Sequence, residues 1–96
     1  IRDEFDIGHG PIHERTAQSI VVNGTLTMRE LQAETGWPFE WLPRENVAAW
    51  TVRHLGRVPR RDETIELNGY RFTATEVNAG RPRRVRVERV SEEPAG

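Results

Sequence analysis

Hydrophobic and polar positions alternate along the last third of the chain. Three runs place an apolar residue at every second position, the period of a half-buried strand: residues 64–67, 70–77 and 83–90. Asn68-Gly69, between the first two runs, is a dipeptide typical of a tight hairpin turn. The alternation changes phase at Val77, which indicates a bulge or a twist in the second run. The pattern predicts a three-stranded antiparallel meander.

Apolar residues recur at helical spacing in two earlier segments. Thr27 is the expected N-cap of the first helix, because Glu30 stands three residues later and completes a capping box. Gly36 is the expected end of this helix. The second helix is expected from about Asn46 to Leu55, with Gly56 as its stop.

These elements predict one domain flanked by two irregular ends. Residues 1–18 contain Gly and Pro without a sustained apolar period, so they are expected to form a linker or an extended arm. Residues 19–90 are expected to form the domain, which starts with a short β-branched strand, and residues 91–96 a disordered tail. The predicted fold is α+β: two helices packed on a small antiparallel sheet that ends in the meander.

The composition limits the class of protein. A chain of 96 residues with 35% hydrophobic content can build one core. No run approaches the roughly 20 apolar residues that a membrane-spanning helix needs, and the first residues lack a signal-peptide pattern. The chain contains no Cys, which excludes disulfides and thiolate metal sites. We therefore expect a soluble domain.

Arginine is the only basic residue type apart from His, and ten of the 14 arginines lie after residue 48. The candidate anion contacts lie around two Gly-Arg segments that lead into predicted strands: Arg57, Arg60, Arg61, Arg83 and Arg84. They would form a patch only if the two segments were neighbours and the patch outweighed the nearby acids. Acidic residues are interleaved with them, so cross-strand ion pairs are the simpler interpretation and no nucleic acid is expected as a partner.

The pattern offers no strong constellation for a metal or for catalysis. His9 and His13 have the spacing of two ligands on one helical face, but Gly10 and Pro11 break that helix. His54, late in the second helix, is expected to be a capping or solvated residue. No carboxylate pair, nucleophile motif or Gly-rich phosphate loop stands out. We expect neither a metal site, nor a cofactor, nor an enzyme.

Three aromatic residues lie within five positions between the predicted helices: Trp37, Phe39 and Trp41. Two Pro in the surrounding segment WPFEWLPREN exclude regular structure, so a loop that packs inward is expected. The aromatics then either cover the core or serve as anchors of a protein interface, and both interpretations stay open.

The order of these elements resembles the transporter-associated domain, also called the CorC/HlyC domain. The segments LGRVP, GYRFTATEV and RRVRVERV carry the resemblance, most specifically Gly56-Arg57-Val58-Pro59 and Tyr70-Arg71-Phe72. The family usually has Asp-Thr before the second helix and Gly early in it, where this chain has Glu45-Asn46 and Ala48-Ala49. DEFD near the start is similar to a linker that follows a pair of CBS modules in the family.

The resemblance covers nearly the whole chain and carries expectations about fold and function. It implies a fold similar to part of a FAD-binding fold, an analogy that does not establish flavin binding. It also implies a non-enzymatic regulatory domain of a CorC/HlyC-type membrane protein, similar to magnesium and cobalt efflux proteins and haemolysin-like proteins. Such a domain would modulate ion transport at the cytoplasmic face of the membrane.

The resemblance implies partners within the same molecule. These are the CBS modules and the membrane domain of the same chain, or a second copy in a homodimer. Two alternatives remain at this stage: an anion or nucleic-acid binding module that uses the arginine segments, and a flavin- or nucleotide-binding domain.

Overall fold

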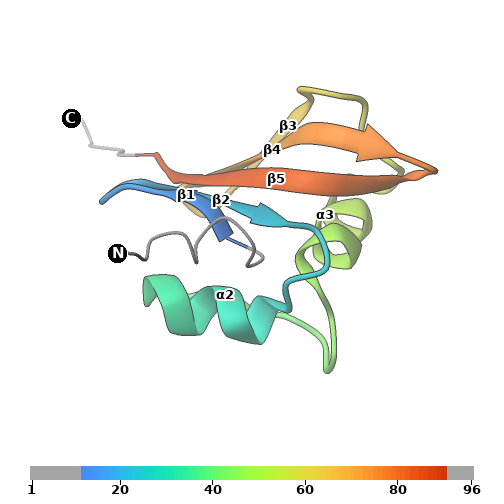
Figure 1. Cartoon of the computed structure of the whole chain (residues 1–96). Coiled ribbons are helices and arrows are strands. Elements are labelled where there is room, and N and C mark those ends of the chain that lie inside the picture. Colours follow the sequence, from blue (N-terminus) through green and yellow to red (C-terminus); the bar gives the residue numbers. More distant parts are fainter. Residues whose placement is uncertain (1–11, 91–96) are drawn as a thin grey trace, which may run out of the picture.

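The computed structural model describes residues 12–90, in which two helices pack on one face of a five-stranded antiparallel sheet (Figure 1). The elements in chain order are β1 (Ile12–Arg15), β2 (Ser19–Asn23), α2 (Met28–Thr35), α3 (Val47–Leu55), β3 (Thr64–Leu67), β4 (Tyr70–Asn78) and β5 (Arg81–Arg89). The strand order across the sheet is β1-β2-β5-β4-β3. The predicted α+β class and the two helices on a sheet are confirmed, whereas the expectations for residues 1–11 and 91–96 lie outside the described residues.

Strands β3, β4 and β5 form the predicted meander. Both of its hairpin turns have two consecutive residues with positive φ, Asn68-Gly69 at 54° and 87° and Ala79-Gly80 at 54° and 76°. Two positive φ values define the type I′ turn, whose twist matches that of the flanking strands. The pairing of β4 with β5 shifts register between Ala74 and Val77, which confirms the irregularity predicted at Val77.

The sheet extends beyond the meander through the N-terminal part of the chain. Strand β2 pairs with β5, so the first predicted strand lies beside the last one. The described end of the expected arm forms strand β1, which pairs with β2 as an edge strand. The alternation rule missed this strand because it has only four residues and a bulge between Ile12 and Glu14.

The two helices begin and end at the residues that the sequence predicts. In α2, the Thr27 side chain accepts a hydrogen bond from the Glu30 backbone N–H, and the Glu30 side chain accepts one from the Thr27 backbone N–H, which completes the capping box. In α3, the Asn46 side chain accepts from the backbone N–H of Ala49. Gly36 and Gly56 close the helices in the left-handed conformation. Among residues 12–90, no helix is long and apolar enough to cross a membrane.

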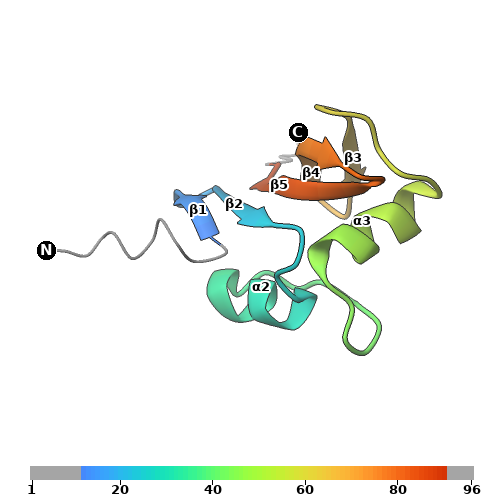
Figure 2. The same cartoon turned by 45° about the vertical axis from the view of Figure 1, so that its right-hand side comes forward.

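The core lies between the helices and the inner face of the sheet (Figure 2). Phe72 is fully buried and stacks on Trp50 of α3, with ring centroids 4.2 Å apart and planes 28° apart. Val85 and Val87 continue the same face on β5 and are also fully buried. The remaining buried members of the cluster come from β2, the link from β2 to α2, and the two helices: Ile20, Val22, Leu26, Met28, Leu31 and Val47.

A close backbone approach at Gly24 joins three elements. The Gly24 N–H donates to the carbonyl of Arg83 on β5, and the Gly24 carbonyl accepts from the N–H of Ala48 in α3, each at 2.9 Å. A Cβ on residue 24 would lie 2.2 Å from the carbonyl oxygen of Pro82 and 2.9 Å from the Cβ of Ala48. Only glycine fits between these two elements without moving the backbone.

The two type I′ turns allow a matched test. Ala79 carries a Cβ in the left-handed region, which costs about 1–2 kcal/mol, whereas Asn tolerates this region. The Ala79→Asn substitution should therefore raise the free energy of unfolding by about 1 kcal/mol in urea denaturation. The reverse exchange in the other turn, Asn68→Ala, should lower it by a similar amount. Two changes of the same sign would contradict this account of the turns.

Candidate functional site

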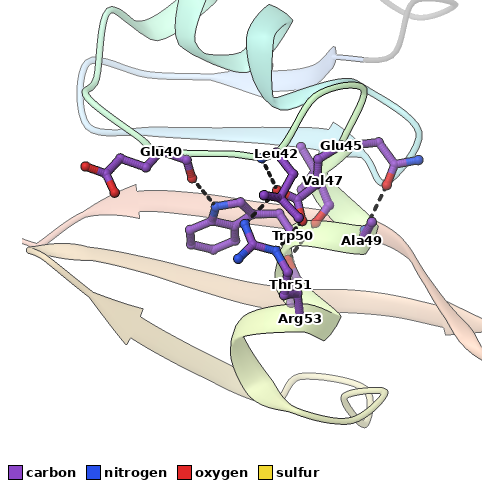
Figure 3. A network of polar contacts seen from close by, with 9 residues as sticks. Glu40, Leu42, Glu45, Val47, Ala49, Trp50, Thr51 and Arg53 are labelled. Atoms are coloured by element: carbon purple, nitrogen blue, oxygen red, sulfur yellow. Dashed lines mark hydrogen bonds and ion pairs between the residues drawn. The ribbon is translucent and has the colours of Figure 1, made fainter.

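The most distinctive surface is the connection between α2 and α3, which we define as residues 37–46. It has no regular structure, yet backbone hydrogen bonds hold it in place. The indole N–H of Trp50 donates to the carbonyl of Glu40 at 2.9 Å (Figure 3). The N–H of Glu45 donates to the carbonyl of Leu42 at 3.0 Å, and the N–H of Met28 donates to the carbonyl of Glu45 at 2.9 Å. The connection is therefore fixed to both helices.

A buried carboxylate forms the centre of this network. The Glu45 side chain is 5% exposed, and its Oε2 and Oε1 accept hydrogen bonds from Arg53 Nε and Nη2 at 2.6 and 2.8 Å (Figure 3). Oε1 also accepts from the backbone N–H of Leu42 at 2.9 Å. The hydrogen bonds from Arg53 lower the pKa of Glu45, although burial acts in the opposite direction. The carboxylate thus stays ionised and ties the connection to the second turn of α3.

Two of the three aromatic residues of the connection, Trp37 and Phe39, contact each other edge to face, whereas Trp41 contacts neither ring. Trp37 and Phe39 contact the ring of Tyr70, with centroids 5.2 and 5.0 Å away. Phe39 also meets Phe72 at 5.6 Å in an edge-to-face geometry and so covers the core. Trp41 is half-buried: it packs against the core cluster and also lines a hollow of about 520 Å³ at the start of α2. It makes none of the ring contacts found among the described aromatic residues.

Leu42 lies outward on this fixed connection and is 51% exposed. The neighbouring Arg44 has a positive φ of 64°, a conformation that non-glycine residues rarely adopt. Arg29 and Arg44 both line the hollow beside Trp41. Two acidic residues line it as well: Glu30 is hydrogen-bonded to Thr27, and Glu45 is paired with Arg53. The connection therefore presents an apolar side chain and Arg44 from a rigid base, next to Arg29 of α2.

The five candidate anion contacts lie at one end of the sheet. Arg57, Arg60 and Arg61 belong to the loop between α3 and β3, and this loop pairs with Ala74 of β4 through Asp62. Arg83 and Arg84 lie on β5, on the other side of β4. Because neighbouring strands lie about 4.8 Å apart, the two groups are roughly 10 Å apart across β4 rather than in contact.

Acidic residues pair with several of these arginines. Arg57 forms a two-pronged ion pair with Glu63, which also accepts from the backbone N–H of Arg60, and these bonds lower the pKa of Glu63 to about 2. Arg84 lies 3.8 Å from Glu76 across the β4–β5 pair, and Arg61 lies 4.0 Å from Asp62. Within residues 12–90, Arg60 and Arg83 have no ion-pair partner.

The described histidines are engaged in local contacts. The Nε2–H of His13 donates to the side-chain oxygen of Asn23 at 2.7 Å. His54 packs against Trp50 with centroids 4.1 Å apart and ring planes tilted by 40°, and burial, followed by the charge of Arg53, lowers the pKa of His54. His9 lies outside the described residues. Within 12–90 no group of three or more His, Cys, Asp or Glu side chains could hold a metal ion.

Sequence reasoning missed a second hollow, which has a volume of about 330 Å³. It lies where the end of β2, the start of α3 and the β4–β5 turn meet, and its lining includes Asn23, Gly24, Asn46, Asn78, Arg81 and Arg83. These residues come from separate segments of the chain, so no single sequence motif could have predicted the hollow. One signal was present in the sequence: an asparagine stands at a boundary of three predicted elements, namely Asn23, Asn46 and Asn78.

Comparisons with known proteins agree with the fold and identify the family. The sequence model of the CorC/HlyC family, the transporter associated domain, matches residues 13–91. The chain therefore belongs to the CorC/HlyC transporter-associated domain family. It is 26% identical over 99 residues to Hemolysin C of Brachyspira hyodysenteriae, covering 97% of this chain and 35% of that protein. The chain thus spans about a third of the length of this curated relative.

Solved structures of related domains share the architecture. The CorC-associated region of a Mg²⁺ and Co²⁺ transporter from Neisseria meningitidis aligns with a TM-score of 0.72 and 18% identity, covering 83% of this chain and 99% of that one. A CorC/HlyC domain of a Xylella fastidiosa hemolysin, solved in complex with Mg²⁺ and Mn²⁺, aligns at 0.71 and 21%, covering 85% and 100%. A hemolysin domain from Enterococcus faecalis aligns at 0.74 and 18%, covering 85% and 100%. At these identities the likeness establishes the fold.

The Glu45–Arg53 pair predicts a pH-dependent stability. Because the folded-state pKa of Glu45 is lowered, its contribution is present above the unfolded-state pKa of about 4.3 and is lost as the pH falls through the folded-state value. At pH 7 the Glu45→Gln variant should unfold with roughly 1–3 kcal/mol less free energy than the wild type. In urea titrations this difference should shrink as the pH is lowered below about 4.

The control for this test is Glu40→Gln. Glu40 is exposed on the same connection, and only its backbone carbonyl takes part in the network. This variant should match the wild type at both pH values. If Glu45→Gln and Glu40→Gln behaved alike, the Glu45–Arg53 pair would not be what holds the connection.

Proposed function

We propose that this domain is a non-enzymatic regulatory module of a CorC/HlyC-type membrane protein, acting at the cytoplasmic face of the membrane. It docks through the connection 37–46 onto neighbouring modules of the same chain, namely CBS modules and the membrane domain, or onto a second copy. Docking that is tighter in one state of the transporter shifts the population toward that state and so modulates ion transport. Membership of the family supports the transporter setting.

The observation that carries the docking role is the fixed, partly apolar surface of the connection. Within residues 12–90 the exposed large hydrophobic side chains are Leu42 and Val58, and the half-buried Trp41 directly precedes Leu42 in the chain. Hydrogen bonds from Trp50, Met28 and Arg53 fix this surface before any partner arrives. A preorganised loop loses little conformational entropy on binding, which favours its use as an interface. Strands β1 and β3 leave two sheet edges that a partner could also cover.

Substitutions in the connection test docking. Trp41→Ala should weaken self-association, or binding to the adjoining modules in the full-length protein, by at least about 1–2 kcal/mol without changing the circular dichroism of the domain. Leu42→Asp should weaken it further, because it places a charge in an apolar contact. Sedimentation equilibrium measures self-association, and hydrogen exchange of residues 37–46 in the full-length protein measures docking.

Val58→Asp provides the control, because Val58 is 40% exposed on a different loop. It should leave association unchanged. A core role for Trp41 would show a different result: Trp41→Ala would cost roughly 3–5 kcal/mol of folding stability. That loss, together with a monomeric wild type and no protection of the connection in the full-length protein, would refute the docking role.

We also expect that this domain has no specific site for a divalent cation. The related Xylella fastidiosa domain was solved with Mg²⁺ and Mn²⁺, so the expectation is open to a direct check. Calorimetric titration of the 96-residue chain with magnesium, cobalt and zinc should give only weak, nonspecific heats. A stoichiometric micromolar site that disappears in His9→Ala or His13→Ala would prove the expectation wrong.

A further inference from the structure

We infer that the hollow between the start of α3 and the β4–β5 turn binds a phosphate group. The hollow has a volume of about 330 Å³ and is lined by Asn23, Gly24, Thr25, Asn46, Ala48, Asn78, Ala79, Arg81, Pro82 and Arg83. Two of these ten residues are arginines and none is acidic. The lining therefore carries two positive charges, whereas the formal net charge of the chain is −1. The hollow shares only Asn46 with the docking connection, and the inference does not depend on the proposed function.

The side chains around the hollow are arranged as hydrogen-bond donors. The side-chain oxygen of Asn23 accepts from His13, and the side-chain oxygen of Asn46 accepts from the N–H of Ala49. With their oxygens occupied, both amides keep their NH₂ groups for another acceptor, and within residues 12–90 neither NH₂ group has one. The hollow therefore offers two guanidinium groups and amide donors but no carboxylate, the chemistry that an oxyanion requires.

The binding must rest on side chains rather than on the helix terminus. The backbone N–H groups of Val47 and Ala48 already donate to the carbonyls of Leu26 and Gly24. The N–H of Ala49 donates to Asn46. Arg81 and Arg83 consequently supply the charge, and within the described residues neither has an ion-pair partner. Phosphate fits because guanidinium groups bind its oxygens through charge-assisted, paired hydrogen bonds.

The hollow continues into a neighbouring one that is more apolar. Both are lined by Asn46, Ala48, Arg81 and Pro82, and the second also includes Ala49 and Val52 of α3. A phosphate monoester could therefore place its phosphate near the arginines and its organic part along α3. Two sources share this chemistry, a soluble phosphate monoester and the headgroup of a phospholipid.

Nuclear magnetic resonance titration of the 96-residue chain with inorganic phosphate, at constant ionic strength, tests the inference. The amide signals of Gly24, Ala48 and Ala79 should shift and saturate, with a dissociation constant on the order of 1 mM. Arg81→Gln and Arg83→Gln should each weaken binding by about tenfold. Both side chains are exposed, and circular dichroism checks that the variants keep the fold.

Two further variants make the test specific. Arg86→Gln removes the same charge from the same strand but lies outside the hollow, so it should leave the affinity within about twofold. Thr25→Asp introduces a negative charge into the lining without removing an arginine and should abolish saturable binding. Shifts that never saturate, or equal weakening by Arg86→Gln and Arg83→Gln, would overturn the inference.

Comparison of two probes then identifies the source of the phosphate. Glycerol 3-phosphate represents the soluble monoester, and phosphatidylcholine vesicles with and without phosphatidic acid represent the lipid headgroup. If either probe binds and the Arg83→Gln variant loses that binding, the site is supported. The probe that binds more tightly shows whether the site takes a soluble monoester or a lipid headgroup. Binding of neither probe, despite saturable phosphate shifts, would contradict a site built for a monoester.

Discussion

The structure depends on the close approach of three backbone segments at Gly24. The end of β2, the start of α3 and the first residues of β5 meet there through two backbone hydrogen bonds of 2.9 Å. A Cβ at this position would overlap the carbonyl oxygen of Pro82, so the junction requires glycine. Because the junction fixes the start of α3 relative to the sheet, it also sets where Trp50 meets Phe72. The core and the two candidate surfaces follow from that placement.

Helix α3 then determines both surfaces from opposite ends of its length. Its N-cap Asn46 and Ala48 of its first turn form one wall of the phosphate hollow. Its second turn holds the connection 37–46, because Trp50 and Arg53 bind the backbone and the carboxylate of that segment. A segment without regular structure would otherwise sample many conformations, at a cost of roughly 1–2 kcal/mol for each residue that is ordered. The contacts from one helix therefore convert a loop into a defined surface.

Local rules were sufficient for the helices and the meander, since each depends on neighbours in sequence. The capping box of Thr27, the stop at Gly36 and the phase change at Val77 are short-range signals, and all three are confirmed. Strand β1 and the Glu45–Arg53 pair were not predictable in this way. The strand is defined by its partner β2, and the ion pair by the path of the connection. The hollow lined by Arg81 and Arg83 likewise needs the assembled fold, because its residues come from distant segments.

The distribution of charge explains why recognition by this domain should rely on short-range contacts. On the sheet, Arg71 lies within 4 Å of both Glu66 and Glu88, and Arg84 lies 3.8 Å from Glu76. Such exposed pairs add little stability, but they cancel much of the field that arginines would otherwise project. At physiological salt, fields are further screened within about 8 Å. Two surfaces are then left for recognition: the unbalanced charge of the phosphate hollow and the apolar surface of the connection. Each of them acts only on a partner that is already in contact with it.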